Sequence, residues 1–377
     1  MNTVEVGDLT IGTGHPPRIM GVLNLSRESP YKPSVYDDPD QAAAYVEAEL
    51  VDQGADIVDI GLESANKRFE VLTAEEELDR LDLALETLDA VDTDAIFSIE
   101  TRYHEVAEAA LDGGFDMVND VCGFADPAMP DVCSDHDAAV VKMASPPDLE
   151  RPGAVESVDG IYEALKRGGL TDKTIIDPAF GGWSEGKTLE EDRETFRRLR
   201  EFQALERPIL VSINRKNFLR HLAGRSTEDA LPVSLAATSM AIERGADVVR
   251  THDVAETRDA AIIGDAFAEK ASLAPDIGVT ELDIATRTDL ERHLDAVGAG
   301  DADPGNGVAT AFAITGLERA DKDALLAAAR SRSTLCASDG ARLIIAGSLA
   351  ALAELEIGDK TSERLEAVVD HIHSVCR

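Results

Sequence analysis

The chain has 377 residues, of which 44% are hydrophobic, and its 36 Lys and Arg residues against 73 Asp and Glu residues give a formal net charge of −37 at pH 7. The apolar content excludes a disordered chain, because it is enough to build more than one small core. The charge excludes nucleic acid and anionic membrane as partners, because both would be repelled by so acidic a protein.

No stretch of the sequence approaches the roughly 20 consecutive apolar residues of a membrane span. The first residues, MNTVEVGDLTIGTGHPPR, have no basic segment followed by an apolar one, which is the pattern of a secretory leader. We therefore expect a soluble, cytoplasmic protein.

The acidic residues are spread over predicted helix faces such as 74–86 and 188–202 rather than gathered in a tail. This distribution indicates adaptation to concentrated salt, where a Debye length of about 3 Å at 1 M screens carboxylate repulsion. We therefore expect the melting temperature, measured by calorimetry, to rise from low to molar KCl. A melting temperature that does not respond to salt would identify an ordinary acidic protein.

From residue 18 to residue 268, a short apolar run and an amphipathic segment alternate eight times. The runs are rich in Val and Ile and flanked by turn residues, as is typical of parallel strands buried on both faces. Eight strand–helix units in about 250 residues predict an α/β fold, a (β/α)8 TIM barrel over 1–270. A doubly wound open sheet is the alternative, although it does not explain the number eight. The runs are 18–24, 56–64, 95–101, 116–122, 138–144, 174–180, 208–214 and 247–254.

Residues 271–377 have a different pattern and predict a small C-terminal α/β domain of unknown role. Three segments resemble strands (279–285, 307–317 and 341–347), two resemble helices (321–331 and 362–375), and 298–307 is a loop rich in Gly and Asp. No Lys-Ser or Lys-Thr follows that loop, so we interpret it as a surface loop rather than a phosphate-binding one.

Polar residues gather at the ends of the eight predicted strands, where barrel enzymes place their chemistry. Carboxylates and an amide suit the donor edge of a heterocycle, whereas cations suit phosphate oxygens. The alternative is that some of these residues form salt bridges inside the barrel. Lys187, farther along a loop, is interpreted as a solvated lysine. The strand-end residues are Asn24, Glu63, Ser64, Glu100, Thr101, Asn119, Asp120, Lys142, Asp177, Asn214, Arg215, Lys216, Arg250, Thr251, His252 and Asp253.

Six segments, in order, resemble the dihydropteroate synthase family: IMGVLN (19–24), GADIVDIGLES (54–64), residues 105–129, IIDPAFG (175–181), PILVSINRKNF (208–218) and residues 245–260. The resemblance covers about residues 17–268. It implies a pterin-binding barrel that condenses a 7,8-dihydropterin-6-ylmethyl diphosphate with p-aminobenzoate and releases pyrophosphate with Mg²⁺ assistance. It also implies a homodimer that pairs through barrel helices.

The resemblance further implies a role for each matching residue. Pyrophosphate would be held by Asn24, Arg250 and His252, with Asn24 also near the metal. The pterin would be held by Glu100, Asn119, Asp177 and Lys216, and the catalytic set would be Lys216, Arg250 and His252. Ser64 and Asn217 would lie near the arylamine.

The sequence departs from the family pattern mainly near the arylamine. Residues 26–33 replace the usual Thr-Pro-Asp-Ser-Phe-Ser-Asp-Gly, and residues 65–68 replace Thr-Arg-Pro-Gly; Glu100 stands in place of Asp, and Asn217 in place of Ser. Three hypotheses follow. The chain is a divergent dihydropteroate synthase, a related transferase in which Lys32, Lys67 and Arg68 meet a different amine, or a non-catalytic pterin-binding or assembly protein.

Overall fold

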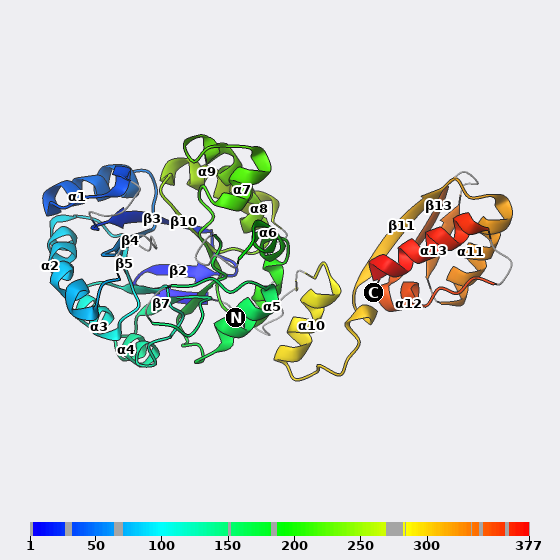
Figure 1. Cartoon of the computed structure of the whole chain (residues 1–377), viewed down its shortest axis with the longest axis horizontal. Helices are drawn as coiled ribbons and strands as arrows, with labels where there is room; N and C mark the ends of the chain where they lie inside the picture. Colours follow the sequence, from blue (N-terminus) through cyan, green and yellow to red (C-terminus); the bar gives the residue numbers. More distant parts are fainter. Residues whose placement is uncertain are drawn as a thin grey trace. The chain divides into compact units, whose positions relative to one another are not determined.

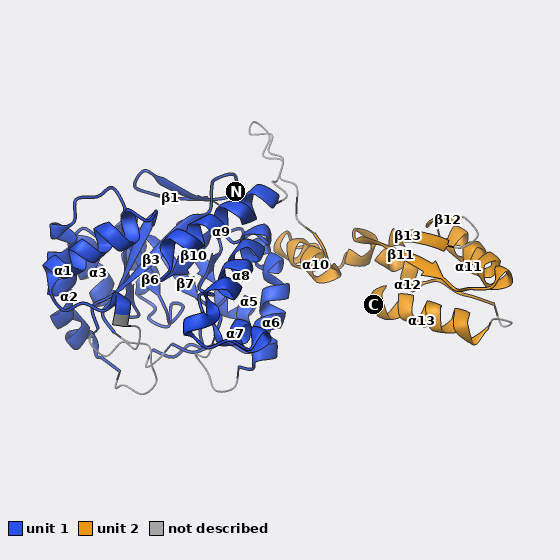
Figure 2. Ribbon diagram, turned by 90° about the horizontal axis from the view of Figure 1, so that it is seen from above, with its two compact units in different colours: residues 1–281 blue, residues 282–377 orange. Residues whose placement is uncertain are grey.

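The structure is a computed structural model that describes residues 3–26, 32–63, 71–149, 152–181, 187–268, 282, 284–332, 334–338, 342–358 and 362–376. The chain divides into two compact units, residues 1–281 and 282–377 (Figure 2). The boundary predicted between residues 270 and 271 lies outside the described residues.

The first unit contains a parallel eight-stranded sheet in the order β8-β7-β6-β5-β4-β3-β10-β9. A parallel bridge between Ile176 and Ile209 connects the two ends, so the sheet is a nearly closed barrel. Each of the eight apolar runs contains one strand, and the predicted TIM-like barrel is confirmed. The strands are β3 (Arg18–Asn24), β4 (Ile57–Gly61), β5 (Ile96–Thr101), β6 (Met117–Asp120), β7 (Ala139–Met143), β8 (Thr174–Asp177), β9 (Leu210–Val211) and β10 (Val248–Thr251).

Helices surround the barrel strands (Figure 1). Two of them begin at capping boxes, Thr73 with Glu76 and Thr188 with Glu191, in which side chain and backbone satisfy each other's hydrogen bonds. No helix among the described residues is both long and apolar enough to cross a membrane. The helices are α1 (Pro39–Tyr45), α2 (Ala74–Ala90), α3 (His104–Asp112), α4 (Met129–Asp135), α5 (Val158–Lys166), α6 (Leu189–Arg197), α7 (Asn217–Ala223), α8 (Leu231–Glu243) and α9 (Val254–Phe267), with a π-helical turn at Val46–Val51 and 3₁₀ turns at Lys32–Ser34, Leu199–Leu205 and Glu228–Ala230.

A repeated Gly-x-Asp segment precedes β4, β6 and β10, at 54–56, 114–116 and 245–247. In each, the glycine has a positive φ, between 90° and 105°, which L side chains rarely adopt. Each aspartate then accepts a hydrogen bond of 2.9 Å from a backbone N–H near the start of the neighbouring strand. The repeat therefore joins adjacent strands at the amino end of the barrel. The donors are Ile19, Phe97 and Ile209.

An N-terminal hairpin, β1 (Thr3–Val6) and β2 (Leu9–Gly12), covers the amino end of the barrel and was not predicted. Its Val4, Val6 and Ile11 are buried in one cluster with the first inward-facing residues of the strands, such as Met20 and Ile57. Since side chains alternate along a strand, the next inward positions lie closer to the carboxyl end. The amino half of the interior is thus apolar, and polar side chains lie in the carboxyl half.

The second unit is a small α/β domain around a three-stranded antiparallel sheet in the order β11-β13-β12. Leu325, Leu343, Ile345 and Leu365 are among the residues of its core. The predicted strands near 307–317 and 341–347 and both predicted helices are present. Residues 279–281 and 283 lie outside the description, and the remaining residues of 279–285 form no strand. The elements are α10 (Arg287–Ala296), a 3₁₀ turn (Pro304–Asn306), β11 (Ala309–Thr315), α11 (Arg319–Ser331), β12 (Leu335–Ser338), β13 (Arg342–Ser348), α12 (Leu349–Ala353) and α13 (Glu363–Cys376).

Candidate active site

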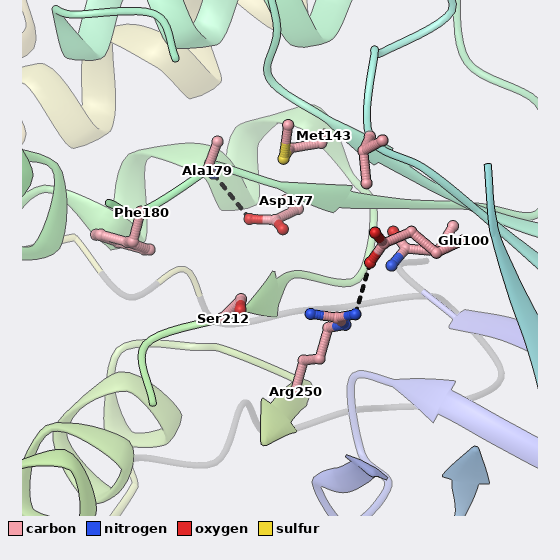
Figure 3. Close-up of a pocket in the computed structure, with 9 residues that line it drawn as sticks. Glu100, Met143, Asp177, Ala179, Phe180, Ser212 and Arg250 are labelled. Carbon is pink, nitrogen blue, oxygen red and sulfur yellow. Dashed lines mark hydrogen bonds and ion pairs between the residues drawn. The ribbon is translucent and has the colours of Figure 1, made fainter. Parts of the chain in front are cut away.

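A pocket at the carboxyl end of the barrel strands contains about 300 Å³ of empty space, part of which is open solvent (Figure 3). Four of the residues that the sequence singled out meet in it: Glu100, Asn119, Asp177 and Arg250. Strand register explains part of this meeting, because Glu100 lies opposite Asn119 on the next strand. The full lining is Glu100, Asn119, Val121, Met143, Asp177, Ala179, Phe180, Ser212 and Arg250.

Arg250 is held between two carboxylates. Its Nε donates to Oδ2 of Asp59 at 2.7 Å, and its Nη2 donates to Oε2 of Glu100 at 2.6 Å (Figure 3 shows the second contact). Its Nη1 has no hydrogen-bond partner among the described residues. The guanidinium is therefore fixed on two sides while one terminal nitrogen is available to a ligand.

Asp59 was missed by the sequence reading. It is fully buried in the middle of β4 and also accepts a hydrogen bond of 3.0 Å from Nδ2 of Asn119. The Asp59 carboxylate thus orients both Arg250 and Asn119, although it does not itself line the pocket. The signal in the sequence is an acid inside an apolar strand, two positions after Ile57, on the face that alternation places inside the barrel.

Burial shifts the pKa values of the ionisable groups in the pocket. Burial raises the pKa of Glu100 to about 7, an effect that Arg250 opposes and Asp59 reinforces. Burial also raises the pKa of Asp177, against a backbone hydrogen bond and Lys216. Burial lowers the pKa of Arg250, but Asp59 and Glu100 more than offset this effect, so Arg250 stays charged. Perturbed groups gathered in one pocket are typical of an active site.

Asp177 and Lys216 both lie at the tight turn after β8. Oδ1 of Asp177 accepts from the backbone N–H of Ala179 at 2.8 Å, which fixes the carboxylate (Figure 3). Lys216 crosses Gly181 so closely that a Cβ at Gly181 would lie 2.9 Å from its Cδ and 3.2 Å from its Nζ. Burial lowers the pKa of Lys216 to about 8, although Asp177 opposes the shift. The lysine is therefore an ionisable donor near neutral pH.

Lys187 is buried, which corrects its interpretation as a solvated loop lysine. Its Nζ donates to the carbonyl oxygen of Ala179 at 2.9 Å and lies 3.3 Å from Oδ1 of Asp192. It is thus tied to the turn that carries the pocket residues Ala179 and Phe180. A lysine can be buried in this way because a carboxylate and a carbonyl compensate for its lost hydration.

Asn24 and His252 form a second group, joined by Ser34. Nδ2 of Asn24 donates to Oγ of Ser34 at 2.7 Å, and Nδ1 of His252 lies 3.4 Å from the same oxygen. Burial lowers the pKa of His252 to about 3, and Arg250 reinforces the shift. The imidazole is therefore neutral at physiological pH. The sequence reading did not identify Ser34.

Other predicted residues lie elsewhere. Asn217, at the first position of α7, is exposed, is not among the pocket-lining residues, and its Oδ1 accepts from Arg220. Lys142 is fully buried, and its Nζ donates to the carbonyl oxygens of Arg167 and Gly169. Ser64 and the changed segment 65–68 lie outside the described residues.

Internal pairing accounts for another of the strand-end cations. The guanidinium of Arg215 makes a two-pronged contact with the carboxylate of Asp253, with both N–O distances 2.9 Å. The alternative of a salt bridge inside the protein therefore holds for Arg215. It holds in part for Arg250, which pairs with Asp59 and Glu100 but also lines the pocket.

Asn24 is also the predicted metal ligand. Its Oδ1 lies 3.6 Å from the point that a Cβ of Gly61 would occupy, and Oε1 of Glu100 lies 4.0 Å from that point. Two oxygens therefore lie near Gly61, which has no side chain. Mg²⁺ takes oxygen ligands and commonly keeps few protein ligands beside substrate phosphates, so this donor set fits it.

A second group with metal-ligand chemistry is His104, Glu105 and Asp126, whose candidate ligand atoms lie within 4.8 Å of one another. Asp126 already accepts hydrogen bonds from the backbone N–H groups of His104 and Ala128 and from the His104 ring. These contacts explain the group as the support for the start of α3.

Residues 20–252 match the family model described as pterin binding enzyme. The chain is 34% identical over 265 residues to a probable bifunctional folylpolyglutamate synthase/dihydropteroate synthase of Halobacterium salinarum, a match covering 67% of this chain. The match spans only 32% of that longer relative. This chain is also 31% identical over 269 residues to the dihydropteroate synthase of Clostridium beijerinckii. That match covers 70% of this chain and 98% of the relative.

Solved structures show the same likeness. The dihydropteroate synthase of Coxiella burnetii in complex with pteroic acid is 30% identical, with a TM-score of 0.58, and the match covers 70% of this chain and 98% of that one. The enzyme of Thermus thermophilus in complex with 4-aminobenzoate is 30% identical, with a TM-score of 0.57, covering 71% of this chain and all of that one. In each case about 30% of this chain is additional.

Proposed function

The chain belongs to the family of pterin-binding enzymes, and we propose that it joins a 7,8-dihydropterin-6-ylmethyl diphosphate to p-aminobenzoate and releases pyrophosphate, as a dihydropteroate synthase. The observation that carries the proposal is the pocket in which the buried carboxylate of Asp177, the largely buried carboxylate of Glu100, an amide and an arginine converge. The related enzymes crystallised with pteroic acid and with 4-aminobenzoate support the choice of substrates.

In this proposal the pterin ring lies against Asp177, Glu100 and Asn119, with Lys216 at its edge. Ionised carboxylates accept from neighbouring ring N–H and NH₂ groups, which gives an orienting, charge-assisted contact. The backbone hydrogen bond to Asp177 and the contact between Asn119 and Asp59 hold these acceptors in place before the ligand arrives. Such preorganisation reduces the cost of binding.

The diphosphate lies toward Arg250, His252 and Asn24. Nη1 of Arg250 is the nitrogen directed away from both carboxylates, and a neutral His252 donates through one ring nitrogen. Mg²⁺, when bound at Asn24 Oδ1, would neutralise phosphate charge and so favour departure of the leaving group. Arg250 thus links the two ends of the substrate, because Glu100 and Asp59 fix it beside the ring pocket.

The reaction requires the C–O bond between the pterin methylene and the diphosphate to break, with its electron pair leaving on pyrophosphate. The amine nitrogen of p-aminobenzoate donates its lone pair to the methylene carbon, forms the C–N bond and releases one proton. The residues described here supply charge stabilisation and orientation rather than a strong base. A proton on the alkylated amine is acidic enough to pass to solvent or to released pyrophosphate.

The changed loops support a second candidate, a transferase that uses the same pterin diphosphate with a different amine. The basis is the replacement of two segments at the arylamine end, including Lys32, Lys67 and Arg68. These cations would suit an amine with an additional negative charge. A pterin-binding protein without turnover is the remaining hypothesis.

The test is pyrophosphate release by the full chain in molar KCl with pterin diphosphate and Mg²⁺. Release with p-aminobenzoate supports the synthase, and release only with another amine supports the second candidate. Calorimetric binding of 6-hydroxymethylpterin without any release supports the non-catalytic protein. If neither the diphosphate nor the pterin binds, all three hypotheses fail.

Pterin affinity is expected to be greatest between about pH 7 and 8. Below the Glu100 pKa of about 7, protonation removes an acceptor, so affinity falls by up to about tenfold per pH unit. Above the Lys216 pKa of about 8, loss of the ammonium charge weakens binding again. Calorimetry with 6-hydroxymethylpterin from pH 5.5 to 8.5 measures this profile. In Glu100→Gln the fall in pterin affinity below about pH 7 should disappear. A wild-type affinity that does not change across this pH range would contradict the prediction.

We also propose that the protein is a homodimer, as the resemblance implies. Apolar side chains on α8 and α9 support this, because Met240, Ile262, Ile263 and Phe267 are 45% to 78% exposed. Gly264 lets these two helices pack closely, since a Cβ there would lie 2.6 Å from the carbonyl oxygen of Ser239. The exposed apolar side chains are therefore carried by two closely packed helices, which suits a partner surface.

A further inference from the structure

Ser34 lies between two residues of the proposed leaving-group site and is fully buried. It follows the altered loop after β3, in a short 3₁₀ turn (Lys32–Ser34). The chain then returns to the end of β3, where Val35 forms a bridge with Asn24 and the N–H of Tyr36 donates to the Asn24 carbonyl at 3.0 Å. Backbone contacts therefore fix Ser34 beside Asn24 independently of its hydroxyl.

The Ser34 hydroxyl contacts both Asn24 and His252. It accepts a hydrogen bond of 2.7 Å from Nδ2 of Asn24, and its oxygen lies 3.4 Å from Nδ1 of His252. A serine hydroxyl has one proton to donate and two lone pairs. Because Asn24 donates to one lone pair of the Ser34 oxygen, the hydroxyl proton can point toward Nδ1 of His252 when that ring nitrogen is unprotonated.

We propose that Ser34 is a positioning residue that fixes both His252 and Asn24 for the pyrophosphate. By donating to Nδ1, it selects the His252 tautomer that carries its proton on Nε2, so that Nε2–H is the donor to the leaving group. By accepting from Nδ2, it turns Oδ1 of Asn24 toward Gly61, where no side chain fills the space. This inference rests on the proposed function for its ligand but not for its geometry.

The environment of the ring agrees with this assignment. His252 is neutral at physiological pH because burial and the neighbouring Arg250 disfavour its charged form. A neutral imidazole has one donor and one acceptor nitrogen, and the hydrogen bond at one nitrogen decides which is which. Hydrogen-bonded neighbours of this kind often decide how well a ligand-binding side chain performs.

The first test reads the tautomer directly. Nitrogen-15 NMR of histidine-labelled full chain, with the His252 signals assigned through the His252→Gln variant, distinguishes a protonated from an unprotonated Nδ1. Wild type should show Nδ1 unprotonated and Nε2 protonated. Ser34→Ala should give a mixture of tautomers, and Ser34→Thr, which keeps a hydroxyl, should restore the wild-type pattern. A protonated Nδ1 in wild type overturns the proposal.

The second test uses inorganic pyrophosphate with Mg²⁺ as the probe in calorimetry. Ser34→Ala should weaken this binding by about 10- to 100-fold, while the affinity for 6-hydroxymethylpterin stays at the wild-type value. Equal losses for both probes, or no loss for either, would overturn the proposal. If wild type binds no pyrophosphate, the proposed function loses its leaving-group site, whereas the NMR comparison still decides whether Ser34 sets the tautomer.

Ser234→Ala is the matched control. Ser234 is also buried, and its hydroxyl contacts the carbonyl of Ala230 and the N–H of Arg215, but it is not among the pocket-lining residues. Its replacement should lower the melting temperature without changing the His252 tautomer or pyrophosphate affinity. A tautomer change in this variant would mean that general loosening, rather than the Ser34 hydroxyl, explains the effect.

Discussion

Arg250→Ala is expected to lower the kcat/KM for pyrophosphate release by about 30- to 5,000-fold. The range corresponds to the loss of roughly 2–5 kcal/mol when one partner of a buried, hydrogen-bonded charge pair is removed. The variant loses the cation that the proposal places beside both the pterin and the diphosphate. It also leaves Asp59 and Glu100 as neighbouring buried carboxylates with no guanidinium between them.

A second effect of Arg250→Ala follows from the repulsion between the carboxylates of Asp59 and Glu100. Arg250 opposes the burial that raises the Glu100 pKa, so its removal should raise this pKa above about 7. The pH below which 6-hydroxymethylpterin affinity declines should then move upward. Arg250→Lys should restore little, because an ammonium cannot reproduce the geometry of a guanidinium bound to two carboxylates.

Arg197→Ala is the matched control for these measurements. Arg197 also pairs with two carboxylates, Glu190 and Glu194, but its side chain is 58% exposed on α6. Exposed ion pairs contribute about 0–1 kcal/mol, so turnover should not change. Unchanged turnover in Arg250→Ala, by contrast, would remove Arg250 from the leaving-group role.

Asp59→Ala is expected to lower both stability and turnover, although Asp59 lies beneath the pocket and does not line it. Removing one partner of a buried pair costs about 3–5 kcal/mol, which corresponds to a fall of roughly 10 °C in melting temperature for a unit of this size. Turnover should fall because Arg250 and Asn119 lose their shared acceptor. Calorimetry and pyrophosphate release measure the two effects.

A stability loss alone would not identify a positioning role, so Asp59→Asn and a control are needed. Asp59→Asn keeps the size of the side chain and should retain more stability than Asp59→Ala, yet it should still lower kcat more than it changes KM. Asp116→Asn is the control, because Asp116 accepts a backbone N–H at the amino end of the barrel. It should affect stability only, and equal kcat losses in both asparagine variants would contradict the role given to Asp59.

The double variant Asp59→Ala/Arg250→Met separates the two functions of the pair. Asp59→Ala leaves Arg250 with Glu100 as its remaining carboxylate, whereas the double variant removes the guanidinium as well, so its loss of stability should be smaller than the sum of the losses in Asp59→Ala and Arg250→Met. Its turnover should remain as low as that of Arg250→Ala. Stability losses that simply add would show that the contact between the two side chains contributes little.

The amino-acid pattern is enough to predict the barrel and the end of it that carries the pocket. Eight apolar runs of strand length, each followed by a helical pattern, have few other ways to bury both faces of a parallel sheet. Parallel strands place all their carboxyl ends at one rim, so Glu100, Asn119, Asp177 and Arg250 could be predicted to meet without knowledge of strand register.

Which contacts those residues make depends on how the strands come together in the folded barrel. Asp59 and Arg250 are 191 residues apart, and Ser34 and His252 are 218 apart, so barrel closure and side-chain rotamers bring them together. A sequence pattern reports whether a position is apolar but not which distant partner compensates a buried charge. For the same reason Lys187, which stands among polar loop residues, could be identified as buried only from its contacts with Ala179 and Asp192.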